Sequence, residues 1–245
     1  MLDWTSVIHK AIQVVVFIPS NTLSSGAYTL PDAARLLELP LPRLRTWIRG
    51  SKALGEDSKS QSRRMPVGDF ETRGEKKDSY FDFLTLIELF SIAQFRRHGV
   101  SMPTLKKARQ ELGNRFKTEH PFALEGLLTD KKNLLKEMGD QTLLELGSGG
   151  QTAFESLLEP FCHRLDFDVS TSLASRFFPL GKSASIIVDP KHAFGRPVIR
   201  GTNTTTEALA ALIRGGEDAR DIADDFHLDL EAVREAWRFE NRRAA

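Results

Sequence analysis

The stretch from Tyr28 to Gly50 constrains the fold more than any other part of the chain, because it has the pattern of two short helices separated by a tight turn. Apolar residues recur at helical spacing before the break and again after it. Pro40 and Pro42 bracket the start of the second helix, since proline suits the first turn of a helix and not its interior. We therefore predict a helix–turn–helix unit, with its apolar positions at Ala33, Ala34, Leu37, Leu44, Trp47 and Ile48.

The start of the first helix has a capping pattern. Thr29 can accept a hydrogen bond from a backbone N–H of the first turn, and Asp32 lies three positions further on. This spacing is typical of a capping box, in which the two side chains satisfy backbone donors reciprocally. We expect the helix to begin at this point.

Basic side chains on the second helix favour a nucleic-acid partner. In a helix–turn–helix unit the second helix enters the major groove of DNA, and arginine contacts both phosphates and base edges. A large aromatic such as Trp47 buries well, so the exposed face should carry polar residues. A polar, turn-rich segment follows at 51–79 and suits a loop or a β-hairpin wing. The predicted DNA-binding residues are Arg43, Arg45, Thr46 and Arg49 on the helix and Arg63 and Arg64 in the wing.

The charge of the chain is unevenly distributed. The net charge is only +1, but residues 28–115 hold 17 Lys and Arg against 11 Asp and Glu. Residues 116–180 hold 6 against 10, and residues 181–245 hold 10 against 11. The positive surplus therefore surrounds the predicted helix–turn–helix, which favours a polyanion as the partner of the N-terminal part.

Composition limits the environment of the protein. A single cysteine, Cys162, excludes a disulfide framework and fits a reducing compartment. The apolar run at residues 11–18 is too short to span a bilayer as a helix. A signal peptide remains an alternative reading of this run, but only Lys10 supplies firm positive charge before it. We expect a cytoplasmic protein that is not attached to a membrane.

Two further helices are expected after the polar segment. Phe81 to Phe95 is densely apolar and predicts a buried helix. Ser101 is expected to cap the next helix, which has Pro103 in its first turn. The inner stripe of that helix would consist of Leu105, Ala108 and Leu112.

Short strands and three helices are expected near the C-terminus. Ile186–Val188 and Val198–Ile199 read as strands, and Ala174–Leu180 looks like another. Thr206 and Asp218 are expected to cap the first two helices. The last helix should run from Leu230 to Phe239, with Val233, Ala236 and Trp237 facing inward.

These patterns predict a mainly α chain with small β elements, in the α+β class. We divide it into an N-terminal segment (1–27), a winged helix-turn-helix domain (28–115), an α+β connector (116–185) and a small helical, helix-turn-helix-like domain (186–245).

The N-terminal domain resembles the MerR-type DNA-binding domain. The resemblance lies in residues 28–34 (YTLPDAA), in 44–47 (LRTW), and in 95–102 (FRRHGVSM), which precede the fourth helix. It implies a winged helix-turn-helix that binds DNA. We expect a homodimer, because one such unit usually reads only a half-site.

The C-terminal domain resembles the family catalogued as domain of unknown function 433. The resemblance lies in residues 188–190 (VDP), 195–202 (GRPVIRGT), 222–226 (IADDF) and 233–237 (VREAW). Members of this family resemble antitoxins of type II toxin–antitoxin operons, and some, called VapB-type, carry a MerR-like domain in front. The resemblance implies that their partners are PIN-like ribonucleases.

Arginine pairs with clustered carboxylates in bidentate geometry, and the resemblance implies that a PIN-like ribonuclease holds its metal with such a cluster. We therefore assign toxin binding to the C-terminal domain. The predicted toxin-binding residues are Arg200 and Asn203 in a loop and Arg238, Arg242 and Arg243 in the basic tail.

Residues with catalytic chemistry are sparse. Asp221, Asp224 and Asp225 share one helical face, which could hold a metal or could be a solvated acidic face near a helix N-terminus. Residues 147–150 (GSGG) lack the spacing and lysine of a phosphate loop. No set of residues takes the roles of nucleophile, base and stabiliser together. We expect no enzyme activity, no cofactor and no resident metal.

Together with the basic helix, the resemblance implies an antitoxin that represses its own operon and neutralises a PIN-like ribonuclease. Two alternatives stay open. One is a stand-alone MerR-like transcriptional regulator whose C-terminal domain senses a ligand or a partner. The other is a metal-dependent enzyme acting on nucleic acid through the three aspartates.

Overall fold

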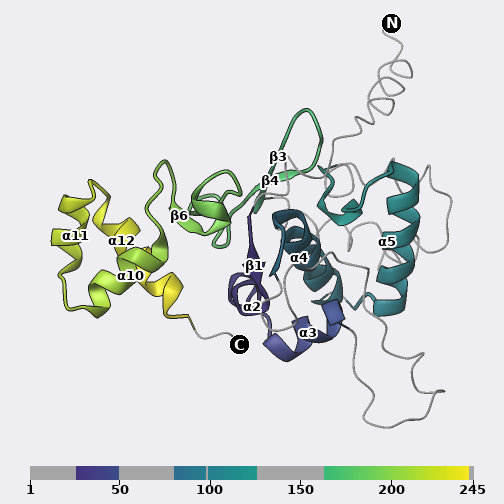
Figure 1. Ribbon diagram of the computed structural model, residues 1–245, viewed down its shortest axis with the longest axis horizontal. Helices are drawn as coiled ribbons and strands as arrows, with labels where there is room; N and C mark the ends of the chain where they lie inside the picture. Colours follow the sequence, from purple (N-terminus) through teal and green to yellow (C-terminus); the bar gives the residue numbers. More distant parts are fainter. Residues whose placement is uncertain (1–25, 50–79, 98, 126–162, 243–245) are drawn as a thin grey trace, which may run out of the picture.

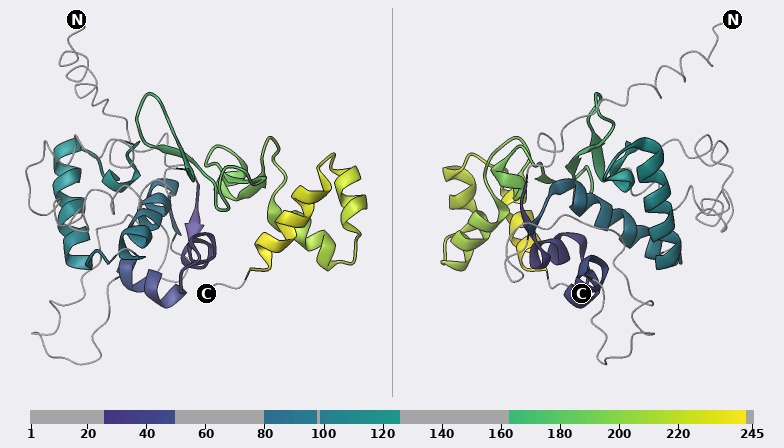
Figure 2. Two further views of the ribbon diagram at one scale, coloured as in Figure 1. Left: turned by 180° about the vertical axis from the view of Figure 1, so that it is seen from behind. Right: turned by 45° about the vertical axis from the view of Figure 1, so that its right-hand side comes forward.

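The computed structural model describes residues 26–49, 80–97, 99–125 and 163–242. Within these residues α-helices dominate and the strands form two small antiparallel sheets, which confirms the predicted α+β class. The helices of residues 26–125 gather at one side, a four-stranded sheet lies in the middle, and the last three helices lie at the far side (Figure 1). Two further views show the same order (Figure 2). We call residues 26–125 the N-terminal lobe and residues 163–242 the C-terminal lobe.

The N-terminal lobe starts with a short antiparallel strand pair, in which Tyr28 is opposite Phe81. The capping box predicted for the first helix is present. The Thr29 side chain accepts from the Asp32 backbone N–H, and the Asp32 carboxylate accepts from the Thr29 backbone N–H. The elements in chain order are β1 (Tyr28–Thr29), α2 (Leu30–Leu37), α3 (Leu41–Arg49), β2 (Tyr80–Phe81), α4 (Phe83–Arg97), α5 (Met102–Phe116) and the 3₁₀ helix η2 (Pro121–Ala123).

The helix α4 forms the core of this lobe, because it is buried on nearly every side. Its sequence is apolar all round rather than on one stripe, as a helix surrounded by other elements requires. The helix α5 lies against it with one stripe only. Ser101 caps α5, and Leu105, Ala108 and Leu112 are its buried residues, as the sequence predicted.

The C-terminal lobe contains a four-stranded antiparallel sheet in the order β3-β4-β5-β6. Its strands are β3 (Leu165–Phe167), β4 (Ala174–Phe177), β5 (Ile186–Val188) and β6 (Pro197–Ile199), with the 3₁₀ helix η3 (Ala193–Gly195) between the last two. The strand β4 pairs with β5 through Phe177 and Val188. Strands from both the predicted connector and the predicted C-terminal domain therefore share one sheet.

Three helices complete the C-terminal lobe: α10 (Thr206–Arg214), α11 (Ala219–Asp225) and α12 (Leu230–Glu240). The cap of α10 is Thr205, one residue before the predicted Thr206, which is fully buried in the first turn. Asp218 caps α11 as predicted. In α12 the buried residue near the end is Phe239, whereas Trp237, predicted to face inward, is only partly buried.

One hydrophobic core runs through both lobes. Phe90 of α4 packs on Phe177 of β4 with the ring centroids 4.9 Å apart, a distance typical of favourable aromatic pairs. The sheet is thereby joined to the helix at the centre of the N-terminal lobe. The two lobes consequently share buried apolar surface instead of being connected by chain alone.

Candidate functional site

The helix α3 separates its side chains into a buried and an exposed set. Leu44, Trp47 and Ile48 are buried against the lobe, as predicted. Arg43, Arg45 and Thr46 are exposed. The Thr46 hydroxyl donates to the Pro42 carbonyl at 2.9 Å. The packing of the buried residues fixes the rotation of the helix, so that two arginines face solvent.

The remaining residues of the predicted DNA-binding set are less fully described. Arg49 is the last residue of α3. Arg63, Arg64 and the predicted wing at 51–79 lie outside the described residues. The candidate nucleic-acid interface therefore consists, within the described residues, of the exposed side of α3.

The turn before α3 is built by a left-handed residue. Glu38 has φ +52° and ψ +47° and ends α2, with its backbone N–H donating to carbonyls of the last turn. A non-glycine residue in this region is uncommon and marks a turn that the surroundings hold in place. Leu39, which follows, is buried. The angle between α2 and α3 is therefore fixed by this cap and by the core.

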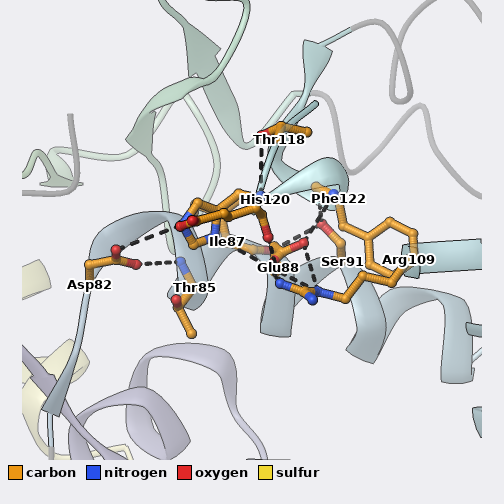
Figure 3. Close-up of polar contacts among 10 residues, drawn as sticks. Asp82, Thr85, Ile87, Glu88, Ser91, Arg109, Thr118, His120 and Phe122 are labelled. Atoms are coloured by element: carbon orange, nitrogen blue, oxygen red, sulfur yellow. Dashed lines mark hydrogen bonds and ion pairs between the residues drawn. The ribbon is translucent and has the colours of Figure 1, made fainter. Parts of the chain in front are cut away.

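A buried polar network ties α4, α5 and η2 together (Figure 3). Glu88 of α4 is fully buried, and its Oε2 accepts from Nη2 of Arg109 at 2.8 Å. Its Oε1 accepts from the backbone N–H of Phe122 at 3.2 Å. The Ser91 hydroxyl donates to the Phe122 carbonyl at 2.7 Å. Such a network stabilises one arrangement of the helices, because each buried group depends on its partners.

His120 belongs to the same network, with its Nδ1 3.3 Å from Oε2 of Glu88. Burial works to lower the pKa of this imidazole. The hydrogen bond to Glu88 and the charges of Glu88 and Asp82 outweigh that effect and raise the pKa above its ordinary value. The histidine is thus held toward its protonated form beside two carboxylates.

The two lobes meet where β1 and α2 face η3 and the end of α12. The Tyr28 hydroxyl donates to the Gly195 carbonyl at 2.9 Å. Burial, followed by the charge of Asp189, raises the pKa of Tyr28 far above its usual range, so this donor keeps its proton. Two ion pairs add to this contact, Arg35 with Glu240 and Arg242 with Glu38.

Contacts with neighbouring parts of the chain hold Arg200 and Asn203 of the predicted toxin-binding loop in place. Nη2 of Arg200 donates to the carbonyls of Lys182 and Ala184 at 2.5 and 2.7 Å, and the guanidinium lies 5.3 Å from the Phe178 ring centroid. Asn203 contacts Nδ1 of His192 at 3.1 Å. Both residues therefore support the loop in the structure of this chain alone.

In the predicted basic tail, Arg238 and Arg242 also have partners within the chain. Arg238 pairs with Glu231 on the exposed side of α12. Arg242 pairs with Glu38 of the N-terminal lobe and lies over the Phe239 ring, 4.4 Å from its centroid. Arg243 lies outside the described residues. Local sequence patterns contain no signal for the Arg242 contact, because its partner is 204 residues away along the chain.

The acidic face of α11 is exposed at Asp221, Asp224 and Asp225. In the part of the chain that the structure describes, no group of three or more His, Cys, Asp or Glu side chains is arranged to hold a metal ion. Among these same residues, no helix is long and apolar enough to cross a membrane.

Comparison with known proteins shows similarities in sequence and in structure. Residues 186–239 match the family model described as "Protein of unknown function (DUF433)", which confirms the resemblance inferred for this region. A Mycobacterium tuberculosis protein described as "Putative antitoxin VapB45" is 25% identical over 223 residues, covering 85% of this chain and 91% of the relative. A second protein of that organism, "Uncharacterized protein Rv2308", is 23% identical over 231 residues, covering 89% and 91%.

A solved structure is similar as well. The crystal structure of Rv2018 from Mycobacterium tuberculosis has a TM-score of 0.67 to this chain at 22% identity. The alignment covers 85% of this chain and 96% of that chain. The fold is therefore shared across both lobes and not only across the C-terminal helices.

Proposed function

We propose that this chain is the antitoxin of a type II toxin–antitoxin system. It binds operator DNA to repress its own operon and neutralises a PIN-like ribonuclease. The similarity to a protein described as an antitoxin extends over 85% of the chain, and the family match lies in its C-terminal lobe. This length of similarity supports an antitoxin role for the two-lobed chain as a unit.

The DNA-binding part of the proposal rests on α3. Its buried face is fixed by Leu44 and Trp47, and its outer face presents Arg43, Arg45 and Thr46 to solvent. The helix α3 is the second helix of the unit, follows α2 across a fixed turn and presents arginines to solvent, which is the arrangement that reads the major groove. We propose a MerR-like mode of binding and a homodimer on a two-fold symmetric operator, in the cytoplasm.

We expect Arg45→Ala to weaken binding to the promoter DNA of this chain's own operon by about fivefold or more, as the loss of one arginine contact to DNA predicts. The measurement is fluorescence anisotropy at one fixed salt concentration. Arg234→Ala is the matched control, since Arg234 is an exposed arginine on α12. Equal losses in the two variants would place the DNA-binding surface elsewhere.

Toxin neutralisation is proposed for the C-terminal lobe. Arg238 and Arg242 lie at its last helix, and both hold carboxylates in the isolated chain. The planar guanidinium that pairs with Glu231 or Glu38 can pair equally with a carboxylate of a toxin. We propose that the tail reaches the acidic active site of the ribonuclease, with Arg200 and Asn203 as a second contact.

A further inference from the structure

The contact between α2 and the end of α12 consists of two crossed ion pairs. Arg35 of α2 pairs with Glu240 at the last position of α12. Glu38, at the end of α2, pairs with Arg242, two residues beyond the helix. Each lobe thus contributes one cation and one anion. In Figure 1 the end of α12 is directed toward α2. We call these four residues the charge latch.

The two arginines of the latch are similarly exposed, Arg35 at 31% and Arg242 at 29%, so the pairs differ in the burial of their carboxylates. The Glu240 side chain is 6% exposed, and its carboxylate also accepts from the hydroxyl of the buried Thr206 in α10. A carboxylate buried to this extent depends on its partners, because unpaired burial of a charge is costly. The inner pair therefore belongs to the permanent contact between the lobes, together with the bond from Tyr28 to Gly195.

The carboxylate of the outer pair is open to solvent. The Glu38 side chain is 48% exposed and the Arg242 side chain 29% exposed. An exposed pair adds little to stability, since water and salt compete for both charges. Arg242 also lies over the Phe239 ring, a contact that does not involve its carboxylate partner. The outer pair can therefore be exchanged without separating the lobes.

At the junction of the two lobes, the charged side chains named below already have partners within the chain, so they offer a small ligand few unpaired charges. The cavity between the lobes is lined by Arg35, Glu240, Arg196 and Glu207, among others. These four side chains pair with one another as Arg35 with Glu240 and Arg196 with Glu207. The Arg196–Glu207 pair is exposed as well, but it lies within the C-terminal lobe. Among the described residues, the outer pair is therefore the exposed pair that joins the two lobes, and a partner that fits the junction would compete for it.

We propose that Glu38 holds the place of a partner carboxylate on Arg242, so that the helix–turn–helix lobe autoinhibits the basic tail until an acidic protein surface displaces Glu38. This inference rests on the proposed function, in which that surface belongs to the toxin. The displaced Glu38 is the residue that ends α2, three positions before α3 begins. A partner bound to Arg242 consequently lies against the turn of the helix–turn–helix.

The test measures the affinity of the full-length chain for the purified product of the gene adjacent to its own. Glu38→Gln frees Arg242 without removing it, so we expect binding about two- to fivefold tighter than that of the unmodified chain, the range typical of a partly exposed ion pair. Arg242→Gln should weaken binding about tenfold or more. Glu207→Gln is the control, because it removes the same charge from an exposed pair outside the tail.

Each outcome has a distinct meaning. Unchanged affinity in Glu38→Gln, with tight binding by the unmodified chain, would overturn the autoinhibition and leave the proposed function standing. A Glu207→Gln variant that binds as much tighter as Glu38→Gln would assign the effect to net charge and also overturn it. No binding by any form of the chain would contradict the proposed function itself.

Discussion

Replacing Glu88 by alanine is expected to lower the free energy of unfolding by about 3–5 kcal/mol, the cost of removing one partner from a buried charge pair. Glu88 is fully buried and accepts from the Arg109 guanidinium and from the Phe122 backbone N–H. Both donors would lose this acceptor, and the Phe122 backbone N–H belongs to a fully buried residue. The change can be measured by urea denaturation at pH 7.

The matched control for this variant is Glu119→Ala. The side chain of Glu119 is exposed, and only its backbone carbonyl takes part in the network, as acceptor for Arg109 at 2.6 Å. The control should therefore stay within about 0.5 kcal/mol of the unmodified chain, as surface substitutions usually do. If Glu88→Ala cost no more than Glu119→Ala, the network would have no role in holding α4, α5 and η2 together.

Replacing Gly195 by alanine is expected to lower the free energy of unfolding by about 2–5 kcal/mol, combining the cost of the left-handed backbone with that of overpacking. Gly195 has φ +80°, and an added Cβ would lie 2.2 Å from the Tyr28 hydroxyl oxygen. That hydroxyl donates to the Gly195 carbonyl, so the clash would also break a bond between the lobes.

Gly201→Ala separates the two costs. Gly201 has the same φ of +80°, but an added Cβ would meet nothing within 4 Å. We expect this control to lose only about 1–2 kcal/mol, the conformational part of the effect. Comparison by thermal denaturation of both variants then isolates the contact with Tyr28. Equal destabilisation would show that Tyr28 yields without cost, and that its contact with η3 does not fix the lobes.

Local patterns were the part of the fold that could be predicted. The capping box of Thr29 and Asp32, the cap at Ser101 and the buried stripe of α5 were all predicted and are confirmed. These features depend on residues within one or two turns of each other. The burial of Trp47 follows from the same helical spacing. Short-range hydrogen bonds and periodicity therefore suffice for such elements.

Contacts between distant segments could not be predicted from these patterns. Tyr28 and Gly195 are separated by 167 residues, and Arg35 and Glu240 by 205. No sequence periodicity relates such positions. In α12, Phe239 is buried with Val233 and Ala236, whereas Trp237, expected to face inward, is only partly buried. Glu88, a lone carboxylate in a densely apolar helix, was the one signal of the buried network that the sequence did contain.

The candidate site likewise has a part that could be predicted from the sequence and a part that could not. The exposed face of α3 could be predicted because helical spacing identifies the buried apolar face, and the polar residues between these positions must then face solvent. The contacts of Arg200 and Arg242 could not, since each is held by a distant partner. The prediction that these residues bind a toxin stays a prediction, and their contacts within the chain show what a toxin would have to displace.

RNA cleavage by the product of the adjacent gene, titrated with this chain, tests the central claim most directly. If the chain is an antitoxin, that product cleaves single-stranded RNA when alone. Cleavage should then cease near one equivalent of the full-length chain, because a type II antitoxin neutralises its toxin by binding it. Cleavage that continues unchanged at a tenfold excess of folded chain, or a product that cleaves no RNA, would contradict the proposed function.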